Sequence, residues 1–427
     1  MAAVSMGVVE RVQRDDVIAL ERELVRIPSY TTEEARLARW IYGYMQKIGL
    51  RARLDSVALP GGKESFNVIG EIPGTGDEPS LLLVGHMDHA PALGRAFDDL
   101  SRWKRPPFEG IVEGDWLYGK GAQDEKGGLC AMLIAAKALI EEGFAPRGPV
   151  YFVAVQGHKR VSSGVRHLLA SGFRPTYAIN TENSGNTIVP RWVGRAEGRM
   201  HVRARAGGRE LHFHFKEIDP ALRSRRTVFE HMVRVLGALG PEMAPPERTK
   251  WMTFTPDEGL PSYPQYRVEK IETISQMHVI VSFQIRTVPG QTEETLRADL
   301  QHLLDALRAE DPAREMELEF PTAPVRPAVS VPDTHPLVEA IAASHEGVTE
   351  NRAEVSARGR LGAAADASLL AAAGITTVLY GPGGGDSDVE YQRAVHEGRL
   401  PPDERISIQS IVDAARAYTV TAIRLCG

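Results

Sequence analysis

Three short segments of the sequence place histidines and carboxylates just after a run of strand-forming residues. GHMD (His86, Asp88) follows SLLLV, VQGHK (His158) follows YFVA, and NTEN (Glu182) follows TYAI. In an open α/β sheet, ligands bind beyond the carboxyl ends of the strands. A fourth segment, GKGAQDEKGG, carries Asp124 in a glycine-rich turn just before an expected helix. We expect these side chains to share one crevice.

The residue types indicate the chemistry that such a crevice could perform. Imidazole nitrogens and carboxylate oxygens are ligands for Zn²⁺, and a catalytic zinc site keeps one position open for water. The ion can activate that water or polarise an amide carbonyl. A polar residue at a strand end is more often a satisfied turn residue, so spacing alone makes these positions candidates and no more.

The surrounding sequence predicts a layered α/β domain that would position these residues. Apolar residues recur at helical spacing in 15–27 and 33–49, and short strand patterns cover 51–57, 65–72 and 80–86. A long helix at 125–143, a strand at 149–155 and a helix at 164–172 follow. Strands that alternate with helices favour three layers around a largely parallel sheet.

A different pattern of expected strands and helices interrupts this one between residues 193 and 323. Here the half-exposed strand patterns 197–208 and 278–290 are combined with amphipathic helices at 226–240 and 292–309, which indicates an α+β domain. After this region, strands and helices alternate again, and the last expected helix covers 407–423. We therefore predict one α/β domain built from 1–192 and 324–427, with an inserted domain at 193–323.

Composition restricts the class of protein. The 427 residues are 43% hydrophobic, enough for two cores, and the net charge of -6 gives no reason to expect a nucleic-acid partner. The first residues lack the apolar stretch of a signal peptide, and no segment is apolar enough to span a membrane, so we expect a cytoplasmic protein. Cys130 and Cys426 have no metal-binding spacing and are expected to be reduced thiols.

Several segments, in this order, resemble one known family. GHMD, GKGAQDEKGG, TEN, GAAADAS, YGPGG and PPDER are together similar to the M20 family of metal-dependent peptidases and amidohydrolases. That family contains aminoacylases, acetylornithine and succinyl-diaminopimelate deacylases, dipeptidases and carboxypeptidases. The resemblance implies a zinc-peptidase-like α/β domain, interrupted by a lid domain that commonly mediates dimerisation.

The resemblance also implies roles for individual residues. His86 resembles the family's first terminal metal ligand, and Asp88 the carboxylate that orients it. Asp124 resembles the carboxylate that bridges two metals, and Glu182 the acidic ligand that completes the first site. A carboxylate behind a ligating histidine fixes its tautomer and raises its basicity, which makes the pair of His86 and Asp88 physically sensible.

Two departures from the family pattern affect the same half of the site. The family places two adjacent glutamates after the strand at 149–155, one a general base and one a ligand of the second metal, but 156–164 contain no carboxylate. Leu400 stands where the other ligand of the second metal is expected, and His396 lies in a stretch that resembles an insertion or a rearranged loop. We expect at most one zinc ion, with His158 as the replacement base.

Four further residues are candidates for substrate contacts. His212 resembles the lid histidine that stabilises the oxyanion in a neighbouring subunit's site, although its surroundings, LHFHF, fit an ordinary strand equally well. Arg286 resembles the lid arginine that binds a substrate carboxylate. Asp366 fits the family's active-site floor. Arg358 belongs to a basic loop that could hold an anionic substrate.

These observations favour an M20-like enzyme that acts on an amide or aminoacyl small molecule, as a homodimer through its lid. In the first version of this hypothesis, the enzyme hydrolyses the amide with the help of one zinc ion. A metal-free site is the alternative, in which His86, His158 and His212 with Asp88 and Asp124 transfer protons, and amide formation or acyl transfer replaces hydrolysis. A third hypothesis is a non-catalytic binding or scaffold protein of the same fold.

Overall fold

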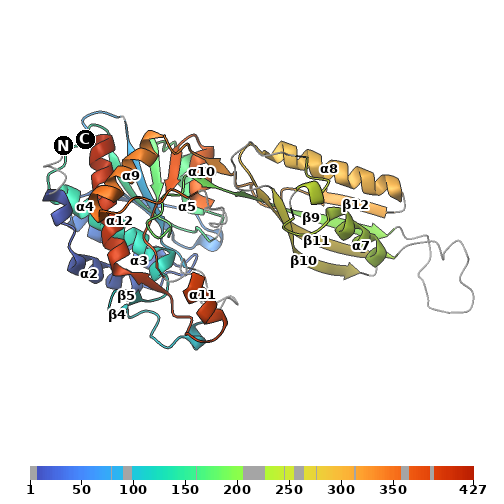
Figure 1. Ribbon diagram of the computed structural model, residues 1–427, viewed down its shortest axis with the longest axis horizontal. Helices are drawn as coiled ribbons and strands as arrows, with labels where there is room; N and C mark the ends of the chain where they lie inside the picture. Colours follow the sequence, from blue (N-terminus) through green and yellow to red (C-terminus); the bar gives the residue numbers. More distant parts are fainter. Residues whose placement is uncertain are drawn as a thin grey trace, which may run out of the picture. The chain divides into compact units, whose positions relative to one another are not determined.

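The computed structural model describes most of the chain, and its described residues form two compact units (Figure 1). The first unit holds the described residues up to Arg191, Val331–Ser356 and those from Ala365 onward, and the second holds those of Trp192–Ser330. The described ranges are 7–77, 79–89, 99–159, 161–204, 227–244, 246–253, 264–275, 277–311, 314–356, 365–384 and 389–427.

A six-stranded sheet forms the centre of the first unit. Its strands lie in the order β1-β2-β6-β3-β7-β14, and the last four of these run parallel to one another. The strands are β1 (Arg51–Ser56), β2 (Phe66–Ile72), β3 (Leu81–His86), β6 (Val150–Val155), β7 (Tyr177–Asn180) and β14 (Thr376–Leu379). Every residue of β3 is buried, which explains why its sequence is a continuous apolar run without alternation.

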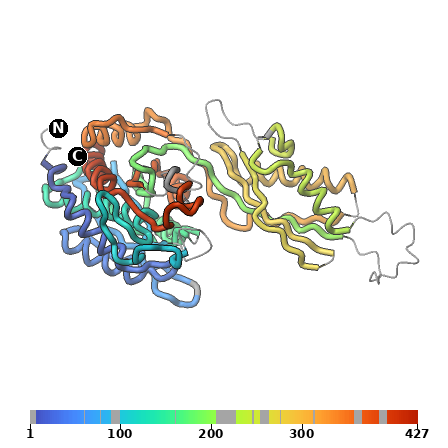
Figure 2. The backbone as a smooth tube through the Cα atoms, turned by 60° about the horizontal axis from the view of Figure 1, so that its bottom comes forward, coloured from blue at the N-terminus to red at the C-terminus, as the bar shows by residue number. Residues whose placement is uncertain are grey.

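Helices cover both faces of this sheet, so the predicted three-layer α/β class is confirmed. One face packs against α4 (Gly127–Glu141), α9 (Pro336–Thr349) and α12 (Ile408–Cys426), with α2 (Arg14–Val25) outside them. The helix α3 (Ala35–Lys47) lies on the same face as α4, with Met45 against Gly70 of β2. The other face packs against α5 (Ser163–Ala170) and α10 (Ala365–Ala372). Figure 2 shows that this unit combines the beginning of the chain, in blue, with its end, in red.

The register of the parallel strands brings three strand ends to one edge of the sheet. His86 at the end of β3 pairs with Val155 at the end of β6, and Val84 pairs with Asn180 at the end of β7. The segments after these strands therefore begin side by side. The strand-end rule that selected His86, His158 and Glu182 rests on this geometry.

A small sheet and a short helix complete the first unit. The sheet has the order β15-β5-β4 and contains β4 (Ile111–Glu113), β5 (Trp116–Tyr118) and β15 (Arg405–Ser407). The stretch around His396, which we expected to be an insertion or a loop, forms the helix α11 (Val389–His396) instead. His396 ends this helix and is exposed. Among the described residues, we find no helix both long and apolar enough to cross a bilayer.

The second unit is a four-stranded antiparallel sheet packed against two helices. The strand order is β10-β11-β9-β12, with β9 (Gly194–Ala204), β10 (Gln265–Ser275), β11 (His278–Thr287) and β12 (Arg314–Glu319). The helices α7 (Val228–Leu239) and α8 (Glu293–Glu310) share a core with Met200, Val281 and Phe283 of the sheet. The short strands β8 (Arg191–Trp192) and β13 (Val329–Ser330) lie near the two boundaries of this unit.

Gly85 is needed for the close packing beneath His86, and we expect the Gly85→Ala variant to be less stable. A Cβ atom there would overlap the carboxylate of Glu125 and the hydroxyl of Thr181. Overpacking of this kind typically costs ~1–3 kcal/mol in free energy of unfolding. Gly43 in α3 is the matched control because a Cβ there meets nothing within 4 Å, so Gly43→Ala should be neutral or stabilising. Thermal unfolding of both variants measures the difference, and equal melting temperatures would contradict the prediction.

Candidate active site

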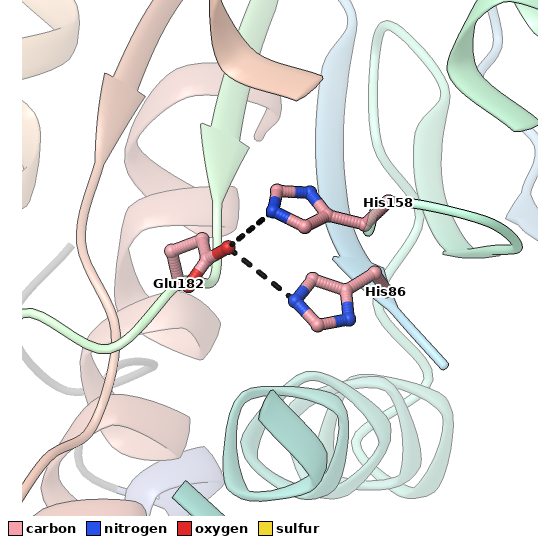
Figure 3. Close-up of side chains that lie close together, drawn as sticks. All are labelled: His86, His158 and Glu182. Carbon is pink, nitrogen blue, oxygen red and sulfur yellow. Dashed lines mark ion pairs between the residues drawn. The ribbon is translucent and has the colours of Figure 1, made fainter. Parts of the chain in front are cut away.

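His86, His158 and Glu182 meet beyond the ends of β3, β6 and β7 (Figure 3). One ligand atom from each lies within 4.8 Å of the other two. The Oε1 atom of Glu182 lies 3.4 Å from Nε2 of His86 and 3.5 Å from Nε2 of His158. The two imidazole rings are stacked, with centroids 4.2 Å apart. Both rings thus present Nε2 to the same carboxylate.

An aspartate lies behind each histidine. The Nδ1 atom of His158 is 2.9 Å from Oδ2 of Asp366, in the first turn of α10, and Nδ1 of His86 is 3.5 Å from Oδ1 of Asp88. Both carboxylates are 1% exposed. Each aspartate therefore favours a tautomer that leaves Nε2 directed at the site.

Asp88 also fixes the turn that carries His158. Its Oδ1 atom accepts a hydrogen bond from the backbone N–H of His158 at 2.9 Å, and its Oδ2 atom accepts one from the N–H of Lys159 at 3.0 Å. The hydroxyl of Thr31 donates to Oδ2 as well, at 2.9 Å. One buried carboxylate thus positions both the imidazole of His86 and the segment that supplies the second imidazole.

Asp124 lies next to His86 but is shared with a lysine. Its Oδ1 atom is 3.0 Å from Nε2 of His86, and the ammonium of Lys159 binds both of its carboxylate oxygens at 2.7 Å. The turn around Asp124 is held by Glu404, whose carboxylate accepts hydrogen bonds from the backbone N–H groups of Gly121, Gln123 and Asp124 at 2.9–3.1 Å. Glu404 is therefore a positioning residue for this side of the site.

The pKa values of His86, Asp366 and Lys159 are each shifted in the direction that favours the charged form of the side chain. Burial alone would lower the pKa of His86, but Glu125 and the neighbouring carboxylates raise it well above its usual value. Burial would raise the pKa of Asp366, but His158 outweighs this effect and lowers it to about 2. Burial would likewise lower the pKa of Lys159, yet Asp124 and Glu182 raise it, so the ammonium stays protonated near neutral pH.

The donor set fits a metal ion. Nε2 of His86 is buried and faces carboxylate oxygens of Asp124 at 3.0 Å and Glu182 at 3.4 Å. A nitrogen and carboxylate oxygens that converge in this way are the donors that zinc binds in proteins. Two imidazoles and a carboxylate form the set His₂Glu, which is typical of catalytic zinc. His86 and Glu182, predicted as ligands, meet here, together with His158, which we predicted as a base.

The other candidate residues lie elsewhere or have different contacts. Asp366, predicted to contact substrate, is buried and lies 2.9 Å from Nδ1 of His158, so it can orient that ring. Arg286 lies on β11 of the second unit, half-buried and opposite Arg195 of β9. His212 and Arg358 fall outside the described residues.

Two buried glutamates near the site were not predicted from the sequence. Glu125 accepts a hydrogen bond from the backbone N–H of His86, and Glu34 accepts one from the N–H of Gly157 at 3.1 Å. Glu125 directly follows Asp124 in the segment QDEK, so its position in the sequence could have indicated that it lies near the site. Nothing in the sequence indicates this for Glu34, because it lies at the start of an amphipathic helix 123 residues before its partner.

Glu34 predicts a pH-dependent difference in stability. Burial, then the charge of Asp88, raise its pKa from 4.5 to about 7. As the pH rises, the carboxyl group of Glu34 loses its proton at a lower pH in the unfolded chain than in the folded one. The free energy of unfolding therefore falls as the pH rises between these two pKa values. In the Glu34→Gln variant, which keeps an acceptor for Gly157, this loss disappears. We expect the variant to gain up to ~3 kcal/mol over the wild type at pH 8 and little at pH 4.5. Melting temperatures at both pH values measure this, and an equal gain at both would contradict it.

Comparison with known proteins identifies the family. The model of peptidase family M20/M25/M40 matches residues 82–424, so the chain belongs to this family, and the resemblance inferred from the sequence is confirmed. The fold agrees: the crystal structure of the aminopeptidase PepT from Bacillus cereus superposes with a TM-score of 0.70 at 17% identity, covering 97% of this chain and 99% of the other.

Two relatives with different named substrates match over most of their length. The N-formyl-4-amino-5-aminomethyl-2-methylpyrimidine deformylase of Bacillus subtilis is 23% identical, covering 97% of this chain and 95% of the relative. The succinyl-diaminopimelate desuccinylase of Delftia acidovorans is 26% identical, covering 80% and 84%. Membership of the family supports a function of the amidohydrolase or peptidase type.

Proposed function

We propose that this protein hydrolyses an amide bond in a small molecule at a site with at most one metal ion and no glutamate base. The observation that carries the proposal is the meeting of His86, His158 and Glu182 at the strand ends of a family M20 chain. The relatives' names support the reaction class, since a formyl group, a succinyl group and a peptide are all joined through amides. They differ in the acyl group, so they leave the substrate's identity open.

The chain's own residues would divide the chemical tasks. When bound, zinc would supply a Lewis acid for the amide carbonyl and would lower the pKa of a water molecule. His86 and Glu182 offer it ligands, and Asp88 and Asp366 hold the two imidazoles in place. Since 156–164 contain no carboxylate, the imidazole of His158 is the group of this turn that can accept a proton whenever its Nε2 carries no ion.

We further propose that the second unit carries the contacts of a homodimer. Phe229 and Val233 expose 48% and 63% of their surface on α7, and Ile271 and Ile274 expose 45% and 56% on β10. Among the described strands, β10 is an outer strand of its sheet and has a partner on one edge. Light scattering of the purified protein tests this proposal, and a monomer at micromolar concentration would refute it.

A substrate panel combined with metal removal tests the function. N-formyl amines, N-succinyl and N-acetyl amino acids and dipeptides are assayed before and after treatment with a chelator, and again after Zn²⁺ is restored. Loss of turnover with chelator and recovery with Zn²⁺ supports the proposal. Full turnover that is insensitive to chelator supports the metal-free alternative. A protein that binds one of these amides tightly without converting it, with or without Zn²⁺, is a binding protein instead.

A further inference from the structure

The turn after β6 places a lysine directly after the second histidine of the site. His158 reaches Glu182, while the next residue, Lys159, reaches Asp124. Both backbone N–H groups are held by the same carboxylate, Asp88. The backbone of both residues is therefore held by one carboxylate, which sets where their side chains start.

The lysine competes with a metal ion for Asp124. Its ammonium lies 2.7 Å from both carboxylate oxygens, so a cation already occupies the coordinating face of this group. A divalent ion bound to Asp124 would lie within a few ångströms of that ammonium, and like charges at such a distance repel each other. The carboxylate is thus already neutralised by a cation that belongs to the chain.

His158 can take the place that Asp124 leaves. Its Nε2 lies as close to Oε1 of Glu182 as that of His86 does, 3.5 Å against 3.4 Å. Ligands that are each ~2.0–2.2 Å from a tetrahedral ion lie at about this mutual distance. Its Nδ1 is bonded to Asp366, the arrangement that ligating histidines almost always have.

We infer that this chain holds a single ion with His86, His158 and Glu182, and that Lys159 acts as a built-in cation that keeps Asp124 out of the coordination sphere. The inference rests on the proposed function insofar as the site binds a metal. It assigns Lys159 a positioning role: the ammonium balances the charge of Asp124 where a further ion would otherwise be attracted.

Metal titrations of the metal-free protein test the ligand set without any turnover assay. Zn²⁺ affinity and stoichiometry are measured by calorimetry for the wild type, Asp124→Asn, His158→Ala and Lys159→Met. We expect one ion per chain in the wild type. Asp124→Asn removes no ligand but leaves the ammonium of Lys159 uncompensated, so it should weaken the affinity by about 10-fold at most, whereas His158→Ala should weaken it at least ~100-fold because a ligand is lost. Lys159→Met should tighten it by about 10-fold or more, because the repulsion is removed and Asp124 is released.

A control variant at another lysine and a spectroscopic count of the imidazole ligands complete the test. Lys137 also binds two carboxylate oxygens, at 2.9 and 3.0 Å, and is 26% exposed against 24% for Lys159, so Lys137→Met should leave Zn²⁺ affinity unchanged. X-ray absorption of the zinc-loaded wild type should count two imidazole ligands, and circular dichroism checks that each variant folds.

The outcomes separate this inference from the proposed function. A count of one imidazole, or loss of Zn²⁺ binding in Asp124→Asn with full binding in His158→Ala, overturns the ligand set even if the protein hydrolyses amides. Two ions per wild-type chain overturn the role of Lys159. Conversely, one ion with two imidazoles in a protein that converts no amide supports the ligand set while the proposed function fails.

Discussion

The His86→Ala variant is expected to lose its bound ion and at least ~10³-fold in turnover on an amide substrate. His86 is buried, and its Nε2 lies within 3.4 Å of both Asp124 and Glu182, so its removal leaves these carboxylates without the imidazole between them. Elemental analysis of the purified variant measures the ion, and steady-state kinetics on a substrate from the panel measures turnover.

His396→Ala is the control for this variant. His396 is exposed at the end of α11, and the sequence placed it close to the position of a second-metal ligand. We expect wild-type ion content and turnover. If His86→Ala kept both its ion and its activity, the site at the strand ends would not be the active site. If His396→Ala lost an ion, a second metal would be bound after all.

Replacement of His158 with alanine should lower turnover by ~10²–10⁴-fold if the imidazole transfers a proton, and more if it also holds the ion. Asp366→Asn should have a smaller effect, about 10–100-fold, because the ring remains while its orientation is less well fixed. The rate constant kcat of both variants is measured together with their ion content. A variant that loses turnover but keeps its ion identifies His158 as a base, whereas loss of both identifies it as a ligand.

His167→Ala is a matched control for His158→Ala. His167 also pairs with an aspartate, its Nε2 lying 3.3 Å from Oδ1 of Asp55, but it lies on α5 and is 37% exposed. Its removal should leave kcat unchanged. Wild-type turnover in His158→Ala, or an equal loss in His167→Ala, would show that the imidazole of His158 has no specific role.

The sequence was most informative where a side chain follows a buried parallel strand. β3 is apolar from Leu81 to Val84 because helices cover both faces of the sheet, and such a strand can be recognised without knowledge of its neighbours. Its end, and the ends of β6 and β7, then indicate His86, His158 and Glu182 as neighbours. The fold class and the family followed from the same segments.

The sequence was least informative for the outer strands of the second unit. β10 and β12 were not predicted, and most of their residues are exposed or half-buried, with REMELE in β12 as an example. Such a strand has only a short apolar pattern, since it packs on one side and lies at the edge of its sheet. These strands are formed by pairing with β11 and β9, which sequence periodicity does not reveal.

The sequence by itself determined that the turn after β6 lacks a carboxylate and that the other three segments keep His86, Asp124 and Glu182. Only the tertiary structure decided how the replacements are used. It places Asp366 behind His158 across 208 residues of chain, and it directs Lys159 to Asp124 across 35. The physical reason is that residue types limit which bonds a side chain can form, whereas the packing of distant segments selects its partner.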